Sequence, residues 1–243
     1  MTKKTTRFKQ LVLSPEILML PVAHDPLCAR IAEQAGFKAI CTAGYANSAA
    51  LLAKPDVDLL TLSEMVDAAW RIVDAVDIPV FADGDTGHGN VTNVVRTVRQ
   101  FEKAGVASLL IEDQVSPKRC GHMAGKDVIP AGDMVAKLNA ALDARQDLDF
   151  MITARTDAIA VNGIDDAIER ANLYRDAQGH LRSRRAKPCQ HYPGRKNAHA
   201  HSQGIGGDRI CGGCVSDSQY LRYCQSGCRA FHTTLSNRYP CGT

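Results

Sequence analysis

The chain has 243 residues, of which 45% are hydrophobic and 23% charged, a balance that is ordinary for a globular protein and excludes disorder over the whole length. No apolar run approaches the roughly 18 residues of a membrane-spanning helix, so we expect no membrane partner. The N-terminal stretch has no apolar core followed by a cleavage site, which predicts a cytoplasmic protein, with the mitochondrial matrix or the peroxisome as alternatives.

Charge is divided unevenly along the chain. Residues 1–177 carry a net charge of −5, and residues 178–243 carry a net charge of +8. The last 66 residues also hold six of the nine cysteines, but only seven Val, Ile, Leu, Met or Phe residues. A segment so poor in apolar side chains buries little core. We therefore interpret residues 1–177 as one folded domain and residues 178–243 as a tail.

Five short apolar runs alternate with amphipathic segments in the first 177 residues. The runs cover residues 18–23, 39–44, 79–85, 108–114 and 149–157. Their length and their lack of polar alternation predict parallel strands that are buried on both faces. Helices are predicted over residues 61–73, 91–101, 130–145 and 163–176, the first beginning with a capping box. This alternation indicates an α/β fold with about five βα units.

Polar side chains follow three successive predicted strands at the point where each strand ends. They are Asp83 and Asp85, Glu112 and Asp113, and Arg155 and Asp157. The carboxyl edge of parallel strands carries the active site in barrels and in open α/β folds. Any one of these acids is as readily explained as the N-cap of the next helix, but three polar strand ends in succession favour a site.

Asp83, Asp85 and Glu112 form an all-oxygen cluster drawn from two neighbouring strands. Carboxylates without a His or Cys partner suit Mg²⁺ or Mn²⁺. We expect Gly84 to leave both aspartates on one face of a strand, two residues apart. The alternative, a phosphate-binding loop at residues 86–90, rests on a weak pattern.

A polar loop follows the fourth predicted strand and contains a cysteine. Cys120 has Lys118 and His122 close to it in the sequence. Nearby cations favour the thiolate, which predicts a thiol that acts as acid, base or nucleophile; the alternative is a surface loop with a free thiol. Cys28 and Cys41 lie in apolar patterns instead, and are predicted to be core residues.

The motif KRCGH at 118–122, with ADGDTGHGN before it and LIEDQ between them, resembles the isocitrate lyase/phosphoenolpyruvate mutase superfamily. The resemblance runs from about residue 11 to residue 176. It is closest to the small lyases of that group: methylisocitrate lyase, dimethylmalate lyase, oxaloacetate hydrolase and the petal death protein. The mutase branch lacks the cysteine, so Cys120 favours carbon–carbon lyases, with a mutase or an oxaloacetate hydrolase as the alternative.

This resemblance implies a (β/α)₈ TIM-type barrel, usually a homotetramer, that acts on a small 2-hydroxy or 2-oxo dicarboxylate. By motif match, Asp83 and Asp85 would hold Mg²⁺ (or Mn²⁺), and Glu112 and Asp56 would act through water. Asp83 would also contact the substrate.

The same match implies roles around the substrate. Cys120 would be the general acid, on a mobile loop, in a reaction that releases a 2-oxo acid. The substrate carboxylates would be bound or polarised by three basic side chains, Lys118, His122 and Arg155. The Gly44-Tyr45 turn would offer backbone N–H groups to the 2-oxo acid, although Ala43 stands where the family often has serine.

The tail does not continue the family pattern, which has three further strands. Read one base out of register, degenerate codons for residues 194–224 can spell a run that resembles the last two of those strands. We therefore interpret residues 178–243 as out-of-frame sequence, irregular and disordered. The barrel of residues 1–177 is then partial, and we expect poor folding, no lyase turnover and no secure tetramer.

Two other interpretations of the tail stay open. Four of its cysteines could form a zinc site in a non-catalytic fragment: Cys211, Cys214, Cys224 and Cys228. The basic run at 182–185 could touch nucleic acid, but it has no aromatic platform beside it, so we expect no nucleic-acid partner.

Overall fold

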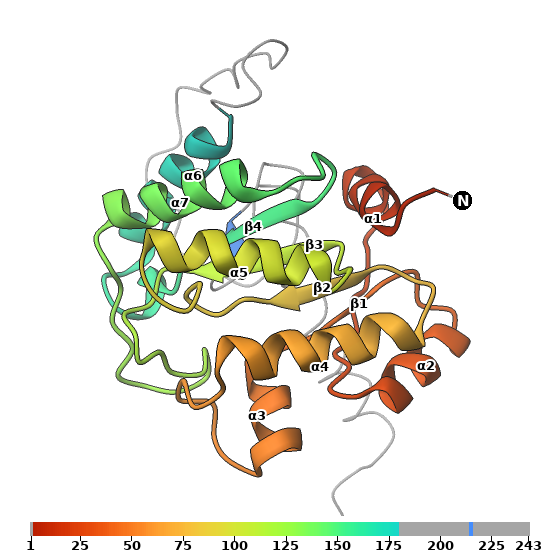
Figure 1. Cartoon of the computed structure of the whole chain (residues 1–243). Coiled ribbons are helices and arrows are strands. Elements are labelled where there is room, and N and C mark those ends of the chain that lie inside the picture. Colours follow the sequence, from red (N-terminus) through yellow and green to blue (C-terminus); the bar gives the residue numbers. More distant parts are fainter. Residues whose placement is uncertain (1, 180–213, 216–243) are drawn as a thin grey trace, which may run out of the picture.

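The computed structural model describes residues 2–179 and a two-residue strand at 214–215. Its parallel strands follow each other in chain order (Figure 1): β1 (Ile40–Cys41), β2 (Val80–Asp83), β3 (Ser108–Glu112) and β4 (Met151–Arg155). Val22 joins the far side of β1 by a single parallel bridge to Cys41. The five predicted strand positions are therefore present in the predicted order, with the first reduced to one bridge.

Helices fill the connections between the strands. They are α1 (Lys4–Leu13), α2 (Pro26–Gln34), α3 (Gly44–Leu52), α4 (Leu62–Ala75), α5 (Val91–Lys103), α6 (Ala131–Ala144) and α7 (Ile164–Gly179), with a short 3-10 helix η1 (Ala158–Ala160). The four helices predicted from periodicity are confirmed as α4 to α7. The capping box also forms, since the Thr61 N–H donates to Glu64 at 2.8 Å and the Glu64 N–H donates to Thr61 Oγ1 at 3.4 Å.

The main core lies between the strands and helices α4 to α7, which cover one face of the sheet in Figure 1. Every residue of β3 is buried, as expected for a central parallel strand. Ile72 of α4, Phe101 of α5 and Leu138 of α6 have no exposed surface and contact this core. Each side chain of this size stabilises the fold by about 1.5–3 kcal/mol when fully buried.

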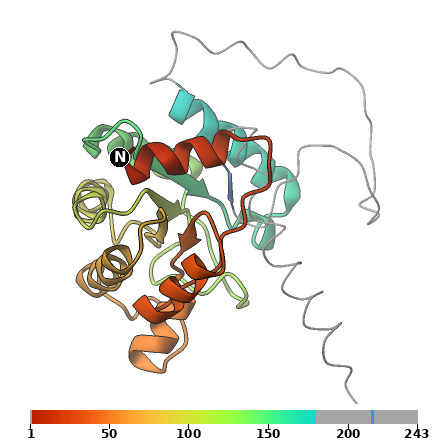
Figure 2. The same cartoon turned by 90° about the vertical axis from the view of Figure 1, so that its right-hand side faces the viewer.

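Helix α1 closes the opposite end of the strands from the predicted site. Phe8 and Val12 pack against residues at the amino ends of the strands, and the Phe8 ring stacks on Phe81 with 5.9 Å between centroids. Lys9 and Thr6 bind the Asp149 carboxylate in the loop before β4, beside which α1 lies in Figure 2. Helix α1 therefore packs at the amino ends of the strands, and the predicted site residues lie at the carboxyl ends.

The last described strand, β5 (Cys214–Val215), pairs antiparallel with the end of β4. The rest of the tail lies outside the described residues. The predictions of a zinc site, of a basic run at 182–185 and of out-of-frame sequence fall there, apart from Cys214, and stay predictions. None of the helices within 2–179 is long and apolar enough to cross a membrane.

Two predictions about particular residues are wrong. Cys28 contacts the main core but is only partly buried, since it lies in the first turn of α2, and Cys41, at the end of β1, is half-buried as well, so neither is the fully buried core residue that was predicted. The apolar run 39–44 is a strand only as far as Cys41, because Gly44 already begins α3.

Candidate active site

The carboxylates after β2 are brought together by a turn. We predicted that Asp83 and Asp85 share one face of a strand, but β2 ends at Asp83. Asp85 has a left-handed backbone, with φ of 49°, and its N–H donates to Asp83 Oδ1 at 3.0 Å. A Cβ at Gly84 would lie 2.6 Å from the Leu110 carbonyl oxygen, so the turn needs glycine to lie against β3.

An ammonium group lies at the centre of these acids. We call the group the Lys118 cluster; its members are Lys118, Asp56, Asp83 and Asp85. Lys118 Nζ lies 2.7 Å from Asp56 Oδ2 and 2.7 Å from Asp85 Oδ1, and all three side chains are buried. The Gly44 N–H, at the start of α3, donates to Asp83 Oδ2 at 2.8 Å. The site is therefore closed on one side by a helix N-terminus, which favours negative charge.

The Lys118 cluster contains three acids and one cation, and this excess of acids shifts the pKa values of Asp85 and Lys118. Burial, together with the charge of Asp83, raises the pKa of Asp85 to about 7 in spite of the neighbouring Lys118. Burial alone would lower the pKa of Lys118, but the surrounding carboxylates, Asp85 above all, raise it. Lys118 is therefore a permanent cation, and Asp85 is poised to gain or lose a proton near neutral pH.

Glu112 and Arg155 form a second ionic pair beside the first. Arg155 Nη1 lies 3.2 Å from Glu112 Oε2, and Nη2 lies 3.1 Å from Asp157 Oδ1. Burial raises the pKa of Glu112 well above its usual range, although Arg155 acts in the opposite direction. Asp83 and Lys118 also act electrostatically on Glu112, so this ion pair adjoins and is coupled to the Lys118 cluster.

Sequence reasoning missed Gln114, which connects these groups. Its side chain is 1% exposed, and Nε2 lies 2.9 Å from Glu112 Oε1, from Asp157 Oδ2 and from the Arg119 carbonyl oxygen. Its Oε1 accepts the Arg119 N–H at 3.0 Å. Gln114 therefore joins β3, β4 and the start of the cysteine loop. The signal available in the sequence was its position two residues after Glu112, on the same side of the strand.

The cysteine loop lies against the same strand ends. The Cys120 N–H donates to the Asp56 carbonyl at 2.9 Å, and Cys120 Sγ lies 3.5 Å from His122 Nδ1. The His122 ring meets the Tyr45 ring edge-on, with 6.4 Å between centroids. A Cβ at Gly121 would clash with Arg155 Nη2, so glycine allows the loop to approach the guanidinium.

Asp113 belongs to a different buried group on the far side of β3. We call this group the Asp113 cluster; its members are Asp113, Thr156, Arg170 and Tyr174. Asp113 Oδ2 accepts hydrogen bonds from Thr156 at 2.7 Å, Tyr174 at 2.8 Å and Arg170 at 3.3 Å, and Oδ1 accepts the Asp157 N–H at 3.0 Å. This acid therefore holds α7 to the ends of β3 and β4, and it does not join the Lys118 cluster.

The predicted site residues gather in three adjoining sets, while their roles stay predictions. Asp56, Asp83, Asp85, Lys118 and Gly44 form the first set, Glu112 and Arg155 the second, and Cys120, His122 and Tyr45 the third. The separation along the chain is large, since the two partners of the Asp56–Lys118 ion pair are 62 positions apart in the sequence.

The residues present fit a hard divalent cation. The Lys118 cluster and Glu112 offer oxygen atoms only, they are largely buried, and they carry more negative than positive charge. Asp85 Oδ1 forms the ion pair with Lys118 but has no hydrogen-bond partner of good geometry. Carboxylate oxygens of this kind are the ligands that Mg²⁺ takes, usually with several waters.

Three comparisons with known proteins bear on this site. Residues 8–179 match the family model described as phosphoenolpyruvate phosphomutase. The chain is 48% identical over 171 residues to 2,3-dimethylmalate lyase of Eubacterium barkeri, a match that covers 70% of this chain and 59% of that one. It is also 48% identical over 176 residues to the chloroplastic carboxyvinyl-carboxyphosphonate phosphorylmutase of Arabidopsis thaliana, covering 71% and 52%.

A solved structure with the same fold is that of phosphonopyruvate hydrolase in complex with oxalate and Mg²⁺. It superposes with a TM-score of 0.67 at 35% sequence identity, over 72% of this chain and 60% of that one. This likeness confirms the predicted fold class. The chain spans between half and three-fifths of the length of these relatives.

Proposed function

The chain belongs to the isocitrate lyase/phosphoenolpyruvate mutase superfamily, and on that premise we propose that its strand-end site serves a Mg²⁺-dependent carbon–carbon lyase. The substrate class is a small 2-hydroxy or 2-oxo dicarboxylate of the methylisocitrate or dimethylmalate type. One observation carries the proposal: the Cys120 thiol lies on a loop whose backbone is hydrogen-bonded to Asp56, next to the carboxylates. A proton donor and a cation-binding cluster are thereby adjacent.

Mg²⁺ would be held by Asp83 and Asp85, with Glu112 and Asp56 acting through water. When bound, the ion would supply Lewis-acid polarisation of the substrate oxygen on which charge develops. The all-oxygen donor set and its excess of negative charge support this choice over zinc. A relative whose structure holds oxalate and Mg²⁺ supports it as well.

Basic side chains would orient the two carboxylates of the substrate. Arg155 is one-fifth exposed and reaches the strand ends beside the loop, and His122 is exposed on the loop itself. Lys118, which the neighbouring carboxylates keep positively charged, would bind a carboxylate of the substrate from its place in the Lys118 cluster. The Gly44 N–H donates to Asp83 in the structure, so a 2-oxo acid at this turn would exchange that hydrogen bond.

Cys120 would complete the reaction as general acid. After the carbon–carbon bond breaks, the electron pair remains on one fragment, and the thiol would give that carbon its proton. His122 Nδ1, 3.5 Å from the sulfur, would then stabilise the thiolate by hydrogen bonding. The loop that carries both residues would exclude water from the carbanion.

A mutase-like reaction is the second candidate, and an oxaloacetate hydrolase the third. The mutase is supported by the 48% identity to a phosphorylmutase, which equals the identity to the lyase. Cys120 separates the candidates, because a lyase needs a proton donor for the carbanion.

The test is an assay of the full chain with Mg²⁺ against 2,3-dimethylmalate, 2-methylisocitrate and oxaloacetate, in which 2-oxo acid release is followed. The same assay tests our expectation that this chain lacks turnover. Where turnover occurs, Cys120→Ala should lower it by roughly 10²–10⁴-fold. Cys41→Ala, a change outside the site, serves as the matched control.

Binding gives a second readout that does not depend on turnover. Oxalate with Mg²⁺ should bind the wild type and Cys120→Ala alike in titration calorimetry, and bind Asp85→Asn weakly. Mg²⁺-independent oxalate binding, or turnover that survives Cys120→Ala, would contradict the proposed lyase.

The proposed partner is the dicarboxylate, and the proposed compartment is the cytoplasm. A homotetramer is expected of intact family members, whereas for this chain we expect no secure tetramer. Sedimentation of the full chain measures the assembly.

A further inference from the structure

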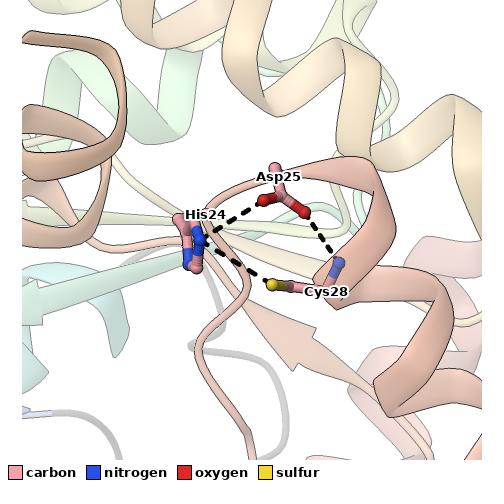
Figure 3. A group of neighbouring side chains, drawn as sticks. All are labelled: His24, Asp25 and Cys28. Atoms are coloured by element: carbon pink, nitrogen blue, oxygen red, sulfur yellow. Dashed lines mark hydrogen bonds and ion pairs between the residues drawn. The ribbon is translucent and has the colours of Figure 1, made fainter.

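Three metal-ligating side chains of different kinds meet at the start of α2, and none of them belongs to the three sets of candidate-site residues. His24 Nε2 lies 3.3 Å from Asp25 Oδ2 and 3.7 Å from Cys28 Sγ (Figure 3). One ligand atom from each side chain lies within 4.8 Å of the other two. Within the described part of the chain, no other group of three His, Cys, Asp or Glu residues meets that limit.

These separations match the edges of a zinc coordination tetrahedron. Zn²⁺ binds nitrogen and oxygen at about 2.0–2.2 Å and sulfur at about 2.3 Å. Ligand atoms at those lengths and the tetrahedral angle are roughly 3.3–3.7 Å apart. The distances from His24 Nε2 to the other two donors, 3.3 Å and 3.7 Å, already fall in this range.

The start of α2 holds the donors in place. Asp25 is the N-cap of the helix, and its Oδ1 accepts the Cys28 N–H at 2.7 Å. This hydrogen bond fixes the carboxylate and turns its other oxygen toward His24, as Figure 3 shows. Pro26 at the first helical position sets the backbone there. The helix start therefore orients Asp25 and Cys28 before any ion binds.

The donor set also selects the kind of cation. One nitrogen, one oxygen and one sulfur suit zinc, whereas Mg²⁺ prefers the all-oxygen set of the Lys118 cluster. The side chains of His24 and Asp25 are each 43% exposed, so water can reach the open coordination position. Burial and the nearby Asp25 raise the pKa of the Cys28 thiol, which therefore carries its proton before metal binds.

We propose that His24, Asp25 and Cys28 bind one Zn²⁺ ion, with water as the fourth ligand, at a site formed by residues outside the Lys118 cluster. Binding exchanges the thiol S–H bond for a sulfur–zinc bond and releases one proton to solvent. The ion would fasten the first turn of α2 to the segment that follows Val22. This inference stands independently of the proposed lyase activity.

Cobalt substitution of the full chain, after treatment with a chelator, tests the site. Co²⁺ should give the sulfur-to-cobalt charge-transfer band and the visible bands of tetrahedral coordination, and Zn²⁺ should remove both. Cys28→Ser and His24→Ala should each abolish the charge-transfer band, while Cys41→Ser keeps it. Asp25→Asn, which retains a good N-cap, should weaken Zn²⁺ binding at least tenfold without unfolding α2.

The tail cysteines need their own control, because they too could bind cobalt. A variant with serine at Cys211, Cys214, Cys224 and Cys228 should keep the band and release one proton per Zn²⁺ at neutral pH. A band that persists in Cys28→Ser, or that disappears in the tail variant, would overturn the proposal. Excess Mg²⁺ that displaces the cobalt would overturn it as well.

Discussion

The Lys118 cluster and the Asp113 cluster are both buried ionic groups at the ends of the same strands, yet their charges are balanced differently. In the Asp113 cluster, one carboxylate receives four hydrogen bonds, from a guanidinium, a phenol, a hydroxyl and a backbone N–H. In the Lys118 cluster, three carboxylates surround one ammonium, and the pKa of Asp85 is raised to about 7 by burial and by its neighbour Asp83.

This difference indicates that the Asp113 cluster stabilises the fold, whereas the Lys118 cluster is suited to binding a ligand. A buried acid whose oxygens are all paired holds elements together and has nothing left to offer a ligand. A buried group with surplus charge costs folding free energy that a bound cation can offset. We therefore expect mutations in the two clusters to respond differently to Mg²⁺.

The largest effect should come from Asp113→Ala. It leaves the Arg170 guanidinium, whose side chain is 8% exposed, without its buried partner. Breaking a buried ion pair in this way costs about 3–5 kcal/mol. Urea unfolding of the full chain measures the loss, and Mg²⁺ should not restore it. A loss of unfolding free energy below about 1 kcal/mol, or its recovery when Mg²⁺ is added, would contradict a purely structural role for the Asp113 cluster.

Lys118→Met should have a smaller effect that Mg²⁺ reverses. Removing the ammonium exposes the acids to each other, but Asp85 can take up a proton near neutral pH, so we expect a loss of about 1–3 kcal/mol. At 100 times the dissociation constant, Mg²⁺ should restore about 2.7 kcal/mol. The unfolding midpoint with and without Mg²⁺ is the measurement, and a midpoint indifferent to Mg²⁺ would argue against a cation site.

Gln114→Leu tests the connection between the strand ends and the cysteine loop. The change keeps the volume but leaves the Glu112 and Arg119 groups without their buried partner, at about 1–3 kcal/mol. Amide hydrogen exchange in residues 115–127 should become faster than in the wild type, while α7 stays protected. Gln114→Glu is the harsher counterpart, since it adds a third acid beside Glu112 and Asp157. Equal amide exchange in the wild type and the Leu variant would contradict this role of Gln114.

The smallest effect concerns α1, which touches neither cluster. Hydrogen bonds from Lys9 and Thr6 lower the pKa of Asp149 below its usual value. The folded pKa is therefore below the unfolded one, so this contact stabilises α1 above the ordinary carboxyl range and is lost as the pH falls through the folded value. Exchange of the α1 amides should rise in acid, and Thr6→Val should move that rise to higher pH; a rise at the same pH would contradict it.

The elements that could be predicted from sequence are those with long periodic patterns. Helices α4 to α7 and strands β2 to β4 follow from periodicity alone, because each buries a continuous apolar face or run. Short runs carried less information. Residues 18–23 are apolar enough for a strand, yet only Val22 pairs, since strand pairing there depends on neighbours remote in sequence.

The candidate site could be predicted by residue type but not by arrangement. The sequence shows the two acids after β2, Asp83 and Asp85. It does not show the left-handed turn at Asp85, because that turn depends on the close packing of Gly84 against β3. The substrate role of Lys118 stays a prediction, but its ion pairs with Asp56 and Asp85 could not be predicted, because folding of the loop sets them. Gln114 was overlooked because a neutral amide carries no signal of charge or metal affinity until its four partners are known.

The glycine that begins α3 limits how the candidate site can be redesigned. A Cβ at Gly44 would lie 2.8 Å from Lys118 Nζ, 2.9 Å from Asp85 Oδ1 and 3.1 Å from Asp56 Oδ2. Even an alanine there would push apart the ammonium and its two acids, so a mutant library should leave this position fixed. Tyr45, the next residue, is 48% exposed, so a substitution there meets little packing, although it removes the ring contact with His122. Substitutions that alter the site are therefore sterically easier at Tyr45 than at Gly44.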